Sequence, residues 1–237
     1  MSLLKLSIII PCLNEAENIV ASLKPLQIMR QRGHEIILCD AGSNDNTVQL
    51  SQPWIDHCSQ SARGRAVQMN AGANLANGDV LCFLHADTLA QKNIDSLILD
   101  ALNQQTHKEK SWGFFSIKLS SPRWQFRIIE WLINTRSCLS RIATGDQGLF
   151  IKHELFKELN GFAEIPLMED IELSKRLKKI SPPVCIKKHK LITSSRRWEK
   201  HGILRTILLM WKLRFAYFLG APESRLAKAY KNHVKNK

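Results

Sequence analysis

Short apolar runs alternate with helix-like patterns along the first hundred residues of the chain. Dense runs of aliphatic residues bounded by turn residues predict strands at Leu6–Ile10, Glu35–Cys39, His57–Ser61 and Val80–Leu84. Apolar residues spaced three and four positions apart predict helices at Ala16–Arg32, Asn46–Gln52, Gly64–Ala76 and Asn93–Gln105. This alternation predicts an α/β fold in which helices flank a mostly parallel central sheet.

The second half of the chain is less regular. We predict strands at Trp112–Leu119, Gly148–Lys152, Val184–Ile186 and Leu191–Ser194, and helices at Trp124–Leu139, Met168–Ile180 and Ile203–Leu219. The last residues, Lys228–Lys237, are expected to fray. The central aromatic residues fall in apolar runs and are expected in the core: Phe114, Phe115, Trp124, Phe126 and Trp131. The pattern predicts one domain over 1–200 and an apolar, basic helical extension over 201–237.

The net positive charge of the chain indicates the chemical class of its binding partners. The 237 residues include 34 Lys and Arg against 21 Asp and Glu, a formal charge of +13. Such an excess favours anionic partners, which are nucleotides, nucleic acid or an acidic membrane surface. No helix-turn-helix, zinc-finger or aromatic RNA-binding pattern is present, so nucleic acid is not expected as a partner.

The cysteines and the hydropathy indicate a compartment. None of the six cysteines forms a Cys-x-x-Cys pair, and Cys12, Cys39 and Cys82 lie in or beside strand-like runs. We therefore expect buried thiols in a reducing compartment and no zinc site. The chain shows no signal-peptide pattern and no uncharged stretch of about eighteen apolar residues, the length of a transmembrane helix. These features predict a cytoplasmic protein, with peripheral contact to the inner face of the cell membrane as an option.

Polar residues follow three of the predicted strands. Asn14-Glu15 follows the first strand, Asp40 the second and Asp87 the fourth. The carboxyl ends of parallel strands are where open α/β sheets bind ligands. A carboxylate there suits a hard divalent cation that also binds phosphate oxygens. Each residue alone also fits a turn or a helix cap, but their shared position at one sheet edge favours a binding site.

Five segments carry a resemblance to a known family. They are Ser7–Glu15, Asp40–Thr47, Gly64–Gly72, His85-Ala86-Asp87 and Met168-Glu169-Asp170. In this order they resemble family 2 glycosyltransferases, which have the GT-A fold, a Rossmann-like fold that binds nucleotide sugars. Gly145–Gly148 and Ser195–Trp198 are similar to small stand-alone bacterial members of the family. The resemblance covers about residues 6–200, and implies a donor half at about 1–106 and an acceptor half at about 107–200.

The resemblance implies transfer of a sugar from a UDP- or GDP-sugar to an acceptor hydroxyl, with inversion and with Mn²⁺ or Mg²⁺. Asp170 is implied as the general base and Glu169 as the residue that orients it. Because Asp170 begins a helix pattern, we expect nearby N–H groups to hold it ionised at neutral pH. The implied donor contacts are Pro11, Leu13, Glu15, Asp40, Gly42, Arg65, Ala86 and Asp87. The implied acceptor contacts are Asp146, Gln147, Arg197 and Trp198.

The metal site departs from the family pattern. Asp87 is the implied metal ligand, but His85 stands where the family has a first aspartate. Imidazole can bind Mn²⁺ and is a poor ligand for Mg²⁺, so His85 either binds metal, contacts ribose or packs. His201 is a further candidate ligand, and an ordinary surface histidine is the alternative.

Alternatives to these assignments stay open. Asp146 and Gln147 also fit a polar turn, and Arg197 with Trp198 also fits a basic helix start. A catalytically silent nucleotide-sugar binder is a second function. A nucleotidyltransferase fits poorly, because the loop after the first strand, Pro11–Glu15, has neither glycine nor cation.

The predicted helix Ile203–Leu219 bears on the acceptor. Arg205, Lys212 and Arg214 make it unsuited to span a bilayer, since each cation costs roughly 2.5–3.5 kcal/mol at the centre. It is either a buried element or a helix in a membrane surface, with Trp211 and Phe215 among the lipid headgroups. A lipid-linked acceptor would suit the second arrangement.

Overall fold

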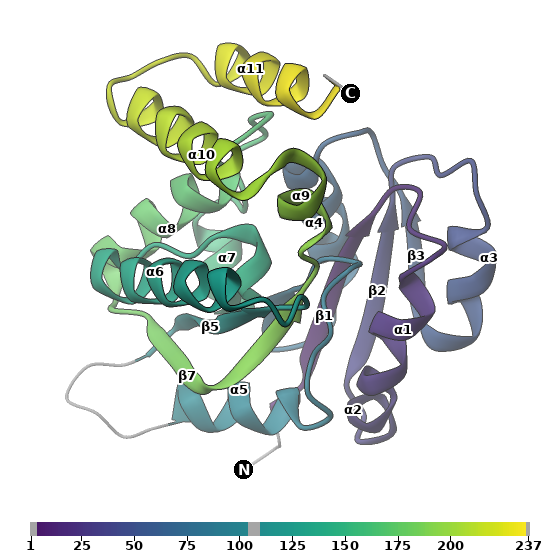
Figure 1. The fold of residues 1–237 in the computed structure, drawn as a ribbon. Coiled ribbons are helices and arrows are strands. Elements are labelled where there is room, and N and C mark those ends of the chain that lie inside the picture. The colour runs from purple at the N-terminus through teal and green to yellow at the C-terminus, as the bar shows by residue number, and fades with distance from the viewer. Residues whose placement is uncertain (1–3, 104–109, 236–237) are drawn as a thin grey trace.

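A seven-stranded sheet forms the centre of the molecule (Figure 1). The structure, a computed structural model, describes residues 4–103 and 110–235, with side chains through Tyr230. Within these residues the strand order is β3-β2-β1-β4-β6-β5-β7, and β6 alone runs antiparallel to its neighbours. The strands are β1 (Leu6–Cys12), β2 (Glu35–Asp40), β3 (His57–Gln60), β4 (Val80–Phe83), β5 (Trp112–Leu119), β6 (Phe150–Lys152) and β7 (Val184–Thr193). The predicted α/β class with a mostly parallel sheet is confirmed.

Helices cover both faces of this sheet. One face packs against α1 (Ile19–Leu23), η1 (Lys24–Leu26), α2 (Gln27–Gln31) and α5 (Ile94–Asn103). The other packs against α4 (Arg65–Leu75), α7 (His153–Glu158) and α8 (Glu169–Ile180). Along β1, Ile8 and Ile10 contact the first layer and Ile9 the second. Because both faces are buried, the central strands read as continuous apolar runs.

A further group of helices gathers beside the β5–β7 edge. They are α6 (Trp124–Ser140), η3 (Gly145–Gln147), α9 (Arg196–His201), α10 (Ile203–Phe218) and α11 (Glu223–Lys235). Figure 1 shows α10 and α11 stacked on the side of the molecule that α6 occupies. Leu213 of α10 and Leu226 of α11 share an apolar cluster with Ile171 of α8. Helices α10 and α11 therefore pack on the main domain through their described side chains, and the predicted division between 1–200 and 201–237 stays a prediction.

Several predicted boundaries are wrong for reasons of backbone chemistry. The helix expected over Ala16–Arg32 is three short pieces, because Pro25 lacks an N–H and falls in the 3₁₀ turn η1. The first strand continues past Pro11 to Cys12. Pro11 is tolerated there because β4 ends opposite Ile9, which leaves Pro11 a strand neighbour on the β2 side.

Other differences involve elements that were missed, merged or too short. The two strands expected near 184–194 are one strand, β7, whose pairing with β5 shifts register after Phe115. The short helices α3 (Thr47–Ser51) and η2 (Gln52–Trp54) fall within or beside the segment expected as one helix, while α7 and α9 were not expected. α11 stays helical to Lys235, where fraying was expected. The last residues of the helix expected over Asn93–Gln105 lie outside the described part of the chain.

The core assignment fails for two aromatic residues of α6. Phe114, Phe115 and Phe126 are buried as predicted. Trp124 and Trp131 are instead 68% and 64% exposed. Helical periodicity identifies a stripe of apolar residues on α6, and two such stripes are present: one packs inward and the other faces solvent. Among the described helices, none combines the length and apolarity needed to cross a bilayer.

Candidate active site

The loops after β1 and β2 are joined by hydrogen bonds at the carboxyl edge of the sheet. Asp40 accepts the backbone N–H groups of Gly42 and Ser43, each at 2.9 Å, and also the Ser43 hydroxyl. Burial by itself would raise the pKa of Asp40, but these hydrogen bonds outweigh it and leave that pKa below its ordinary value. An ionised Asp40 therefore shapes the loop, and its predicted contact with a base stays a prediction.

Gln68 is a structural member of this edge that the sequence did not reveal. Its buried amide on α4 donates to the carbonyl oxygens of Cys12 and Cys39, each at 2.8 Å. These two residues lie at the ends of β1 and β2, so one side chain fixes both strand ends. A glutamine inside an apolar helical pattern gave no signal of this role, because its partners lie in other segments.

The other donor candidates lie along the same edge with different exposure. Pro11 is buried within β1, and Ala86 is buried in the turn after β4. Leu13 is half-buried, and Gly42 is exposed with a φ of 83°. This left-handed conformation is one that glycine adopts without strain. Gly42 is thus exposed at this edge, and its predicted contact with the donor stays a prediction, while Pro11 supports the edge from inside the strand.

Arg196, at the start of α9, reaches carboxylates from two of these loops. Its Nη2 lies 3.5 Å from Glu15 Oε2 and 3.9 Å from Asp87 Oδ2, and its Nη1 lies 3.7 Å from Glu17 Oε2. Glu15 follows β1 and Asp87 follows β4, so the fold brings together two carboxylates that are far apart in the sequence. Arg196 belongs to the motif Ser195–Trp198, in which the predicted binding residues are its neighbours Arg197 and Trp198.

This pair of carboxylates fits a divalent cation that shares its ligands with phosphate. Among the described residues, no three His, Cys, Asp or Glu side chains gather as a ready metal site. The predicted roles of Asp87, His85 and His201 as metal ligands stay predictions. Mg²⁺ and Mn²⁺ are commonly held by one or two carboxylates together with substrate phosphates. Asp87 is the residue that would hold such an ion, beside Glu15.

Asp170 begins helix α8 and is held by two backbone N–H groups. Gly145 N–H donates to its Oδ2 and Ile171 N–H to its Oδ1, each at 2.7 Å. Burial, with the charge of Glu169, nevertheless raises the pKa of Asp170 to about 7. The expectation that the helix start keeps Asp170 fully ionised at neutral pH is wrong, because loss of solvent outweighs the two N–H groups. A carboxylate with this pKa is suited to accept a proton near pH 7.

His85 lies on the Asp170 side of the site. A methyl group on Gly145 would stand 2.9 Å from His85 Nε2 and 3.9 Å from Asp170 Oδ2, so the ring packs directly against this glycine. Burial, with the charges of Arg65 and Arg197, holds the pKa of His85 well below its ordinary value. The imidazole is therefore neutral, and it supports the turn that holds the proposed base.

Gly145→Ala should test this arrangement. The added methyl would force His85 or the turn to move, which would weaken the N–H bond from residue 145 to Asp170. We expect turnover to fall about tenfold or more, since displaced catalytic groups cost rate steeply. Donor affinity, measured by calorimetry, should stay within about twofold because the carboxylates of the donor side are untouched. Unchanged turnover would show that this hydrogen bond does not matter.

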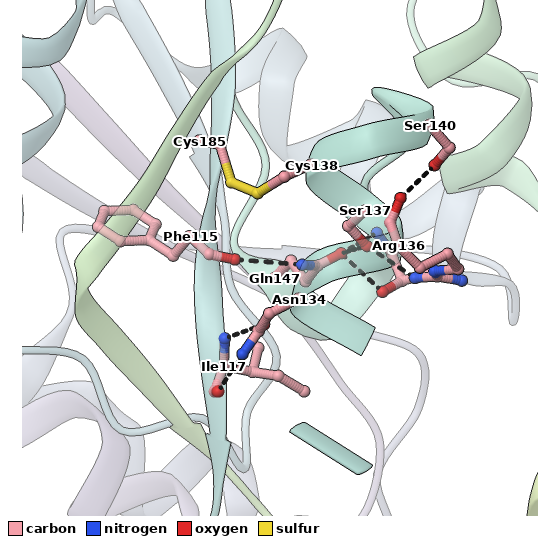
Figure 2. The surroundings of a disulfide bond; sticks show 10 residues. Phe115, Ile117, Asn134, Arg136, Ser137, Cys138, Ser140, Gln147 and Cys185 are labelled. Atoms are coloured by element: carbon pink, nitrogen blue, oxygen red, sulfur yellow. Dashed lines mark hydrogen bonds between the residues drawn. A yellow bond between two sulfur atoms is a disulfide. The ribbon is translucent and has the colours of Figure 1, made fainter. Parts of the chain in front are cut away.

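Gln147 organises the turn instead of facing an acceptor. It is fully buried, its amide oxygen accepts the hydroxyl of Ser137 at 2.7 Å, and its amide nitrogen donates to Phe115 O at 3.3 Å (Figure 2). The same oxygen accepts the N–H and hydroxyl of Thr144. This geometry gives Gln147 a positioning role, in place of the predicted acceptor contact. Its neighbour Asp146 is half-buried, and its role toward an acceptor stays a prediction.

A disulfide lies next to this network. Figure 2 shows the bond between Cys138 of α6 and Cys185 of β7, whose Cα atoms are 6.0 Å apart. Cys12, Cys39 and Cys82 are buried thiols as predicted. The expectation that all the cysteines are free thiols is wrong for this pair. Disulfides are rare in reducing compartments, so the cysteines do not support the predicted cytoplasmic location.

The residues of α9 divide between the site and the core. Trp198 is half-buried and packs against an apolar cluster with Phe126 and Ile129 of α6, so it supports the helix contact, and its predicted contact with an acceptor stays a prediction. The guanidinium of Arg197 lies 5.5 Å from the ring centre of Tyr230, and its charge acts on His85. Arg65 is exposed at the start of α4 and acts on both His85 and Asp170.

Comparison with known proteins identifies the family. The model of glycosyl transferase family 2 matches residues 7–147, more than half of the chain. An uncharacterised glycosyltransferase of Mycobacterium tuberculosis is 31% identical over 114 residues, which are 46% of this chain and 44% of that protein. The chain thus matches less than half the length of this curated relative.

Solved structures share the fold at low sequence identity. Glucosyl-3-phosphoglycerate synthase from Mycobacterium tuberculosis, in complex with Mn²⁺, UDP and glucosyl-3-phosphoglycerate, has a TM-score of 0.65 at 15% identity, covering 92% of this chain and 80% of its own. A mannosyltransferase from Pyrobaculum calidifontis, in complex with GDP-mannose and Mn²⁺, has a TM-score of 0.62 at 18% identity, covering 99% and 65%.

The sheet order, the carboxylates at the strand ends and the family match all indicate the same fold and family. The fold is the GT-A fold of nucleotide-sugar glycosyltransferases. The chain belongs to glycosyl transferase family 2.

Proposed function

We propose that this protein transfers a sugar from a nucleoside-diphosphate donor, a UDP- or GDP-sugar, to an acceptor hydroxyl with inversion. The observation that carries the proposal is Asp170, a carboxyl group with a pKa of about 7 held by Gly145 N–H. Through Gly145 it lies beside His85, which precedes Asp87 by two positions in the loop after β4, and Asp87 shares Arg196 with Glu15. A base and a cation-binding edge are the two parts that such a reaction requires.

The chain's own groups carry the chemistry on the acceptor side. Asp170 accepts the proton of the acceptor hydroxyl while that oxygen forms a bond to the anomeric carbon. The bond from this carbon to the diphosphate oxygen breaks on the opposite face, which inverts the configuration. Glu169 is buried beside Asp170, and its charge raises the pKa of the base into the working range. Gly145 N–H fixes the orientation of the carboxylate.

The donor side supplies charge and shape. The loops at Asn14–Ala16 and Gly42–Thr47 would enclose the nucleoside, and Arg65 and Arg196 would face the phosphates, which guanidinium groups bind well. A divalent ion at Asp87, when bound, would neutralise charge on the leaving diphosphate. Complexes of the similar structures with Mn²⁺ and UDP or GDP-mannose support this assignment. The ribose contact of His85 is disfavoured by its place against Gly145.

The alternative of a silent nucleotide-sugar binder predicts a different outcome from that of an enzyme. Such a binder needs no ionisable group with a raised pKa on the acceptor side. Asp170 is a group of this kind, and it therefore favours an enzyme. The acceptor stays open between a soluble and a lipid-linked hydroxyl compound. The predicted place on the inner face of the cell membrane stays a prediction.

A panel of nucleotide sugars with Mn²⁺ tests the donor class. A ligand present at about 100 times its dissociation constant should add roughly 2.7 kcal/mol of stability, which a thermal-shift assay resolves. Release of nucleoside diphosphate from the best donor would then separate an enzyme from a silent binder. The proposal fails if no nucleotide sugar stabilises the protein or if none is turned over, even slowly by water.

A further inference from the structure

Helix α6 presents large apolar side chains to solvent at helical spacing. Its inward stripe, which includes Phe126 and Ile129, is fully packed. On the opposite side the exposed residues are spaced four, three, one and seven positions apart, which places them on one side of the helix as a second stripe. These outward residues are Trp124, Ile128, Trp131, Leu132 and Leu139.

Helix α10 repeats this arrangement. Thr206 and Leu213 face inward and are buried. Trp211 and Phe215, one turn apart on the outward face, are 70% and 67% exposed. The complete outward stripe of this helix is Leu204, Leu208, Trp211, Phe215, Phe218 and Leu219. Single exposed apolar residues are common on soluble proteins, whereas a contiguous set of large ones marks a binding surface.

The two stripes belong to adjacent helices. Ile203 and Ile207 of α10 pack with Ile133 and Phe126 of α6, and Figure 1 shows the two helices on the same side of the molecule. An open, shallow groove of about 530 Å³ lies along α6, and the residues that line it all belong to this helix: Trp131, Leu132, Thr135, Arg136, Leu139 and Ser140. We call the outward stripes of both helices, with this groove, the α6–α10 face.

The exposed charged side chains of helices α6 and α10 and of the residues that flank α6 are positive. Both helices lie within the described residues, and Glu130 is their one carboxylate. Glu130 is buried and its Oε1 lies 2.9 Å from Arg127 Nη2. The exposed charged side chains on α10 and at the two ends of α6 are cations, Arg123, Arg141, Arg205 and Lys212, and the exposed Glu199 of α9 lies four positions before α10. Aromatic and aliphatic residues bordered by Lys and Arg are the composition that binds an anionic lipid surface.

The groove also approaches the proposed base. Arg136 lines the groove, and the charges of Asp146 and Asp170 both act on it. Its Nη2 donates to Ser137 Oγ at 2.7 Å, while no acceptor among the described residues bonds its buried Nε. The groove and the acceptor side of the site therefore share one residue.

We propose that the α6–α10 face docks the protein on an anionic lipid bilayer and so presents the Asp170 side of the site to an acceptor hydroxyl carried by a lipid. The docking stands on the face alone. The lipid acceptor rests on the proposed glycosyl transfer.

Flotation of the purified full chain with lipid vesicles tests the docking. Vesicles that contain phosphatidylglycerol should carry the protein, vesicles of phosphatidylcholine alone should carry much less, and added salt should weaken the binding. Trp131→Ser and Trp211→Ser should each weaken it about tenfold, as expected for loss of one large side chain from lipid contact. Arg205→Gln and Lys212→Gln should each weaken it about fivefold.

Leu208→Ser and Leu50→Ser form a matched pair. Leu208 is on the outward stripe of α10, while Leu50, 40% exposed, lies on α3 at the β2–β3 edge of the sheet. Only Leu208→Ser should reduce flotation. Absence of binding to anionic vesicles at low salt, or equal loss in both variants, would overturn the docking.

Donor binding in the same preparations separates the two proposals. Trp131→Ser and Trp211→Ser should leave the thermal shift with nucleotide sugar and Mn²⁺ unchanged. Flotation without any donor shift would sink the glycosyltransferase proposal and leave the docking intact. Donor turnover without flotation would overturn the docking and leave the glycosyltransferase proposal intact. Turnover that anionic vesicles bearing a lipid-linked acceptor stimulate, and that Trp131→Ser reduces, would support the lipid acceptor; equal use of a soluble acceptor by both proteins would argue against it.

Discussion

Asp170→Asn should lower turnover about 10²–10⁴-fold, the usual contribution of a positioned general base. Asparagine preserves the volume of the side chain and can still accept the Gly145 N–H bond, but it cannot take a proton. Donor affinity, measured by calorimetry with Mn²⁺, should be retained. A variant that keeps the turnover of the native protein would assign the base to another residue.

The pH dependence gives an independent check on the same residue. Since only the ionised carboxylate accepts a proton, turnover should rise with pH through about 7 and level off above it. Glu169→Gln removes the neighbouring charge that raises this pKa, so the rise should move to lower pH. A profile that is flat between pH 6 and about 8 would contradict the assignment.

The raised pKa of Asp170 also makes the stability of the folded protein depend on pH. The folded protein binds the Asp170 proton more tightly than the unfolded chain, whose pKa is near 3.8, so ionisation of this group costs stability. This cost grows as pH rises from about 4 to about 7 and is constant above. Asp170→Asn should therefore unfold at a temperature at or above that of the native protein at pH 8, which distinguishes lost chemistry from lost folding.

Asp87→Ala should abolish metal-dependent donor binding. The ion would lose its one assigned protein ligand beside the diphosphate. We expect kcat/KM to fall at least about 100-fold, because a catalytic metal is worth several kcal/mol. Excess chelator should produce the same loss in the native protein, and Mn²⁺ should restore activity at least as well as Mg²⁺.

Glu17→Ala is the matched control for this prediction. Glu17 also contacts Arg196, at 3.7 Å, but its side chain is 89% exposed and it follows the loop instead of the strand end. It should leave metal and donor affinity within about twofold, as for other exposed pairs. Full activity of the native protein in excess chelator would show that the ion has no role.

The family and the sheet could be predicted because their signals are local. The runs at Leu6–Ile10 and Val80–Leu84 are apolar throughout, since both faces of these strands are covered, and polar motifs stand directly at their ends. The family match over residues 7–147 falls on the segments where these motifs lie. Even there, the ends of elements depended on single residues such as Pro25, whose missing N–H divides one helix pattern.

The sequence named candidate residues for the site, but it did not predict which of them contact one another. Asp87 and Asp170 were identified by motif, but Arg196 lies 181 positions from Glu15, and no local pattern could place them together. Gln147 was assigned to the acceptor because it is polar and near a turn, whereas packing closed it off from solvent completely. The Cys138–Cys185 bond joins residues 47 positions apart, a pairing that cysteine spacing does not specify.

The α/β class, the family, and the residue types at the ends of β1, β2 and β4 can be predicted from the amino-acid sequence. These depend on neighbours in the chain, through strand and helix periodicity and through short motifs. The pKa of Asp170 and the direction in which Trp124 and Trp131 point are instead set by the folded packing. Both depend on how much solvent is removed from a side chain by segments distant in the sequence, and periodicity carries no information on which stripe of a helix meets its neighbours.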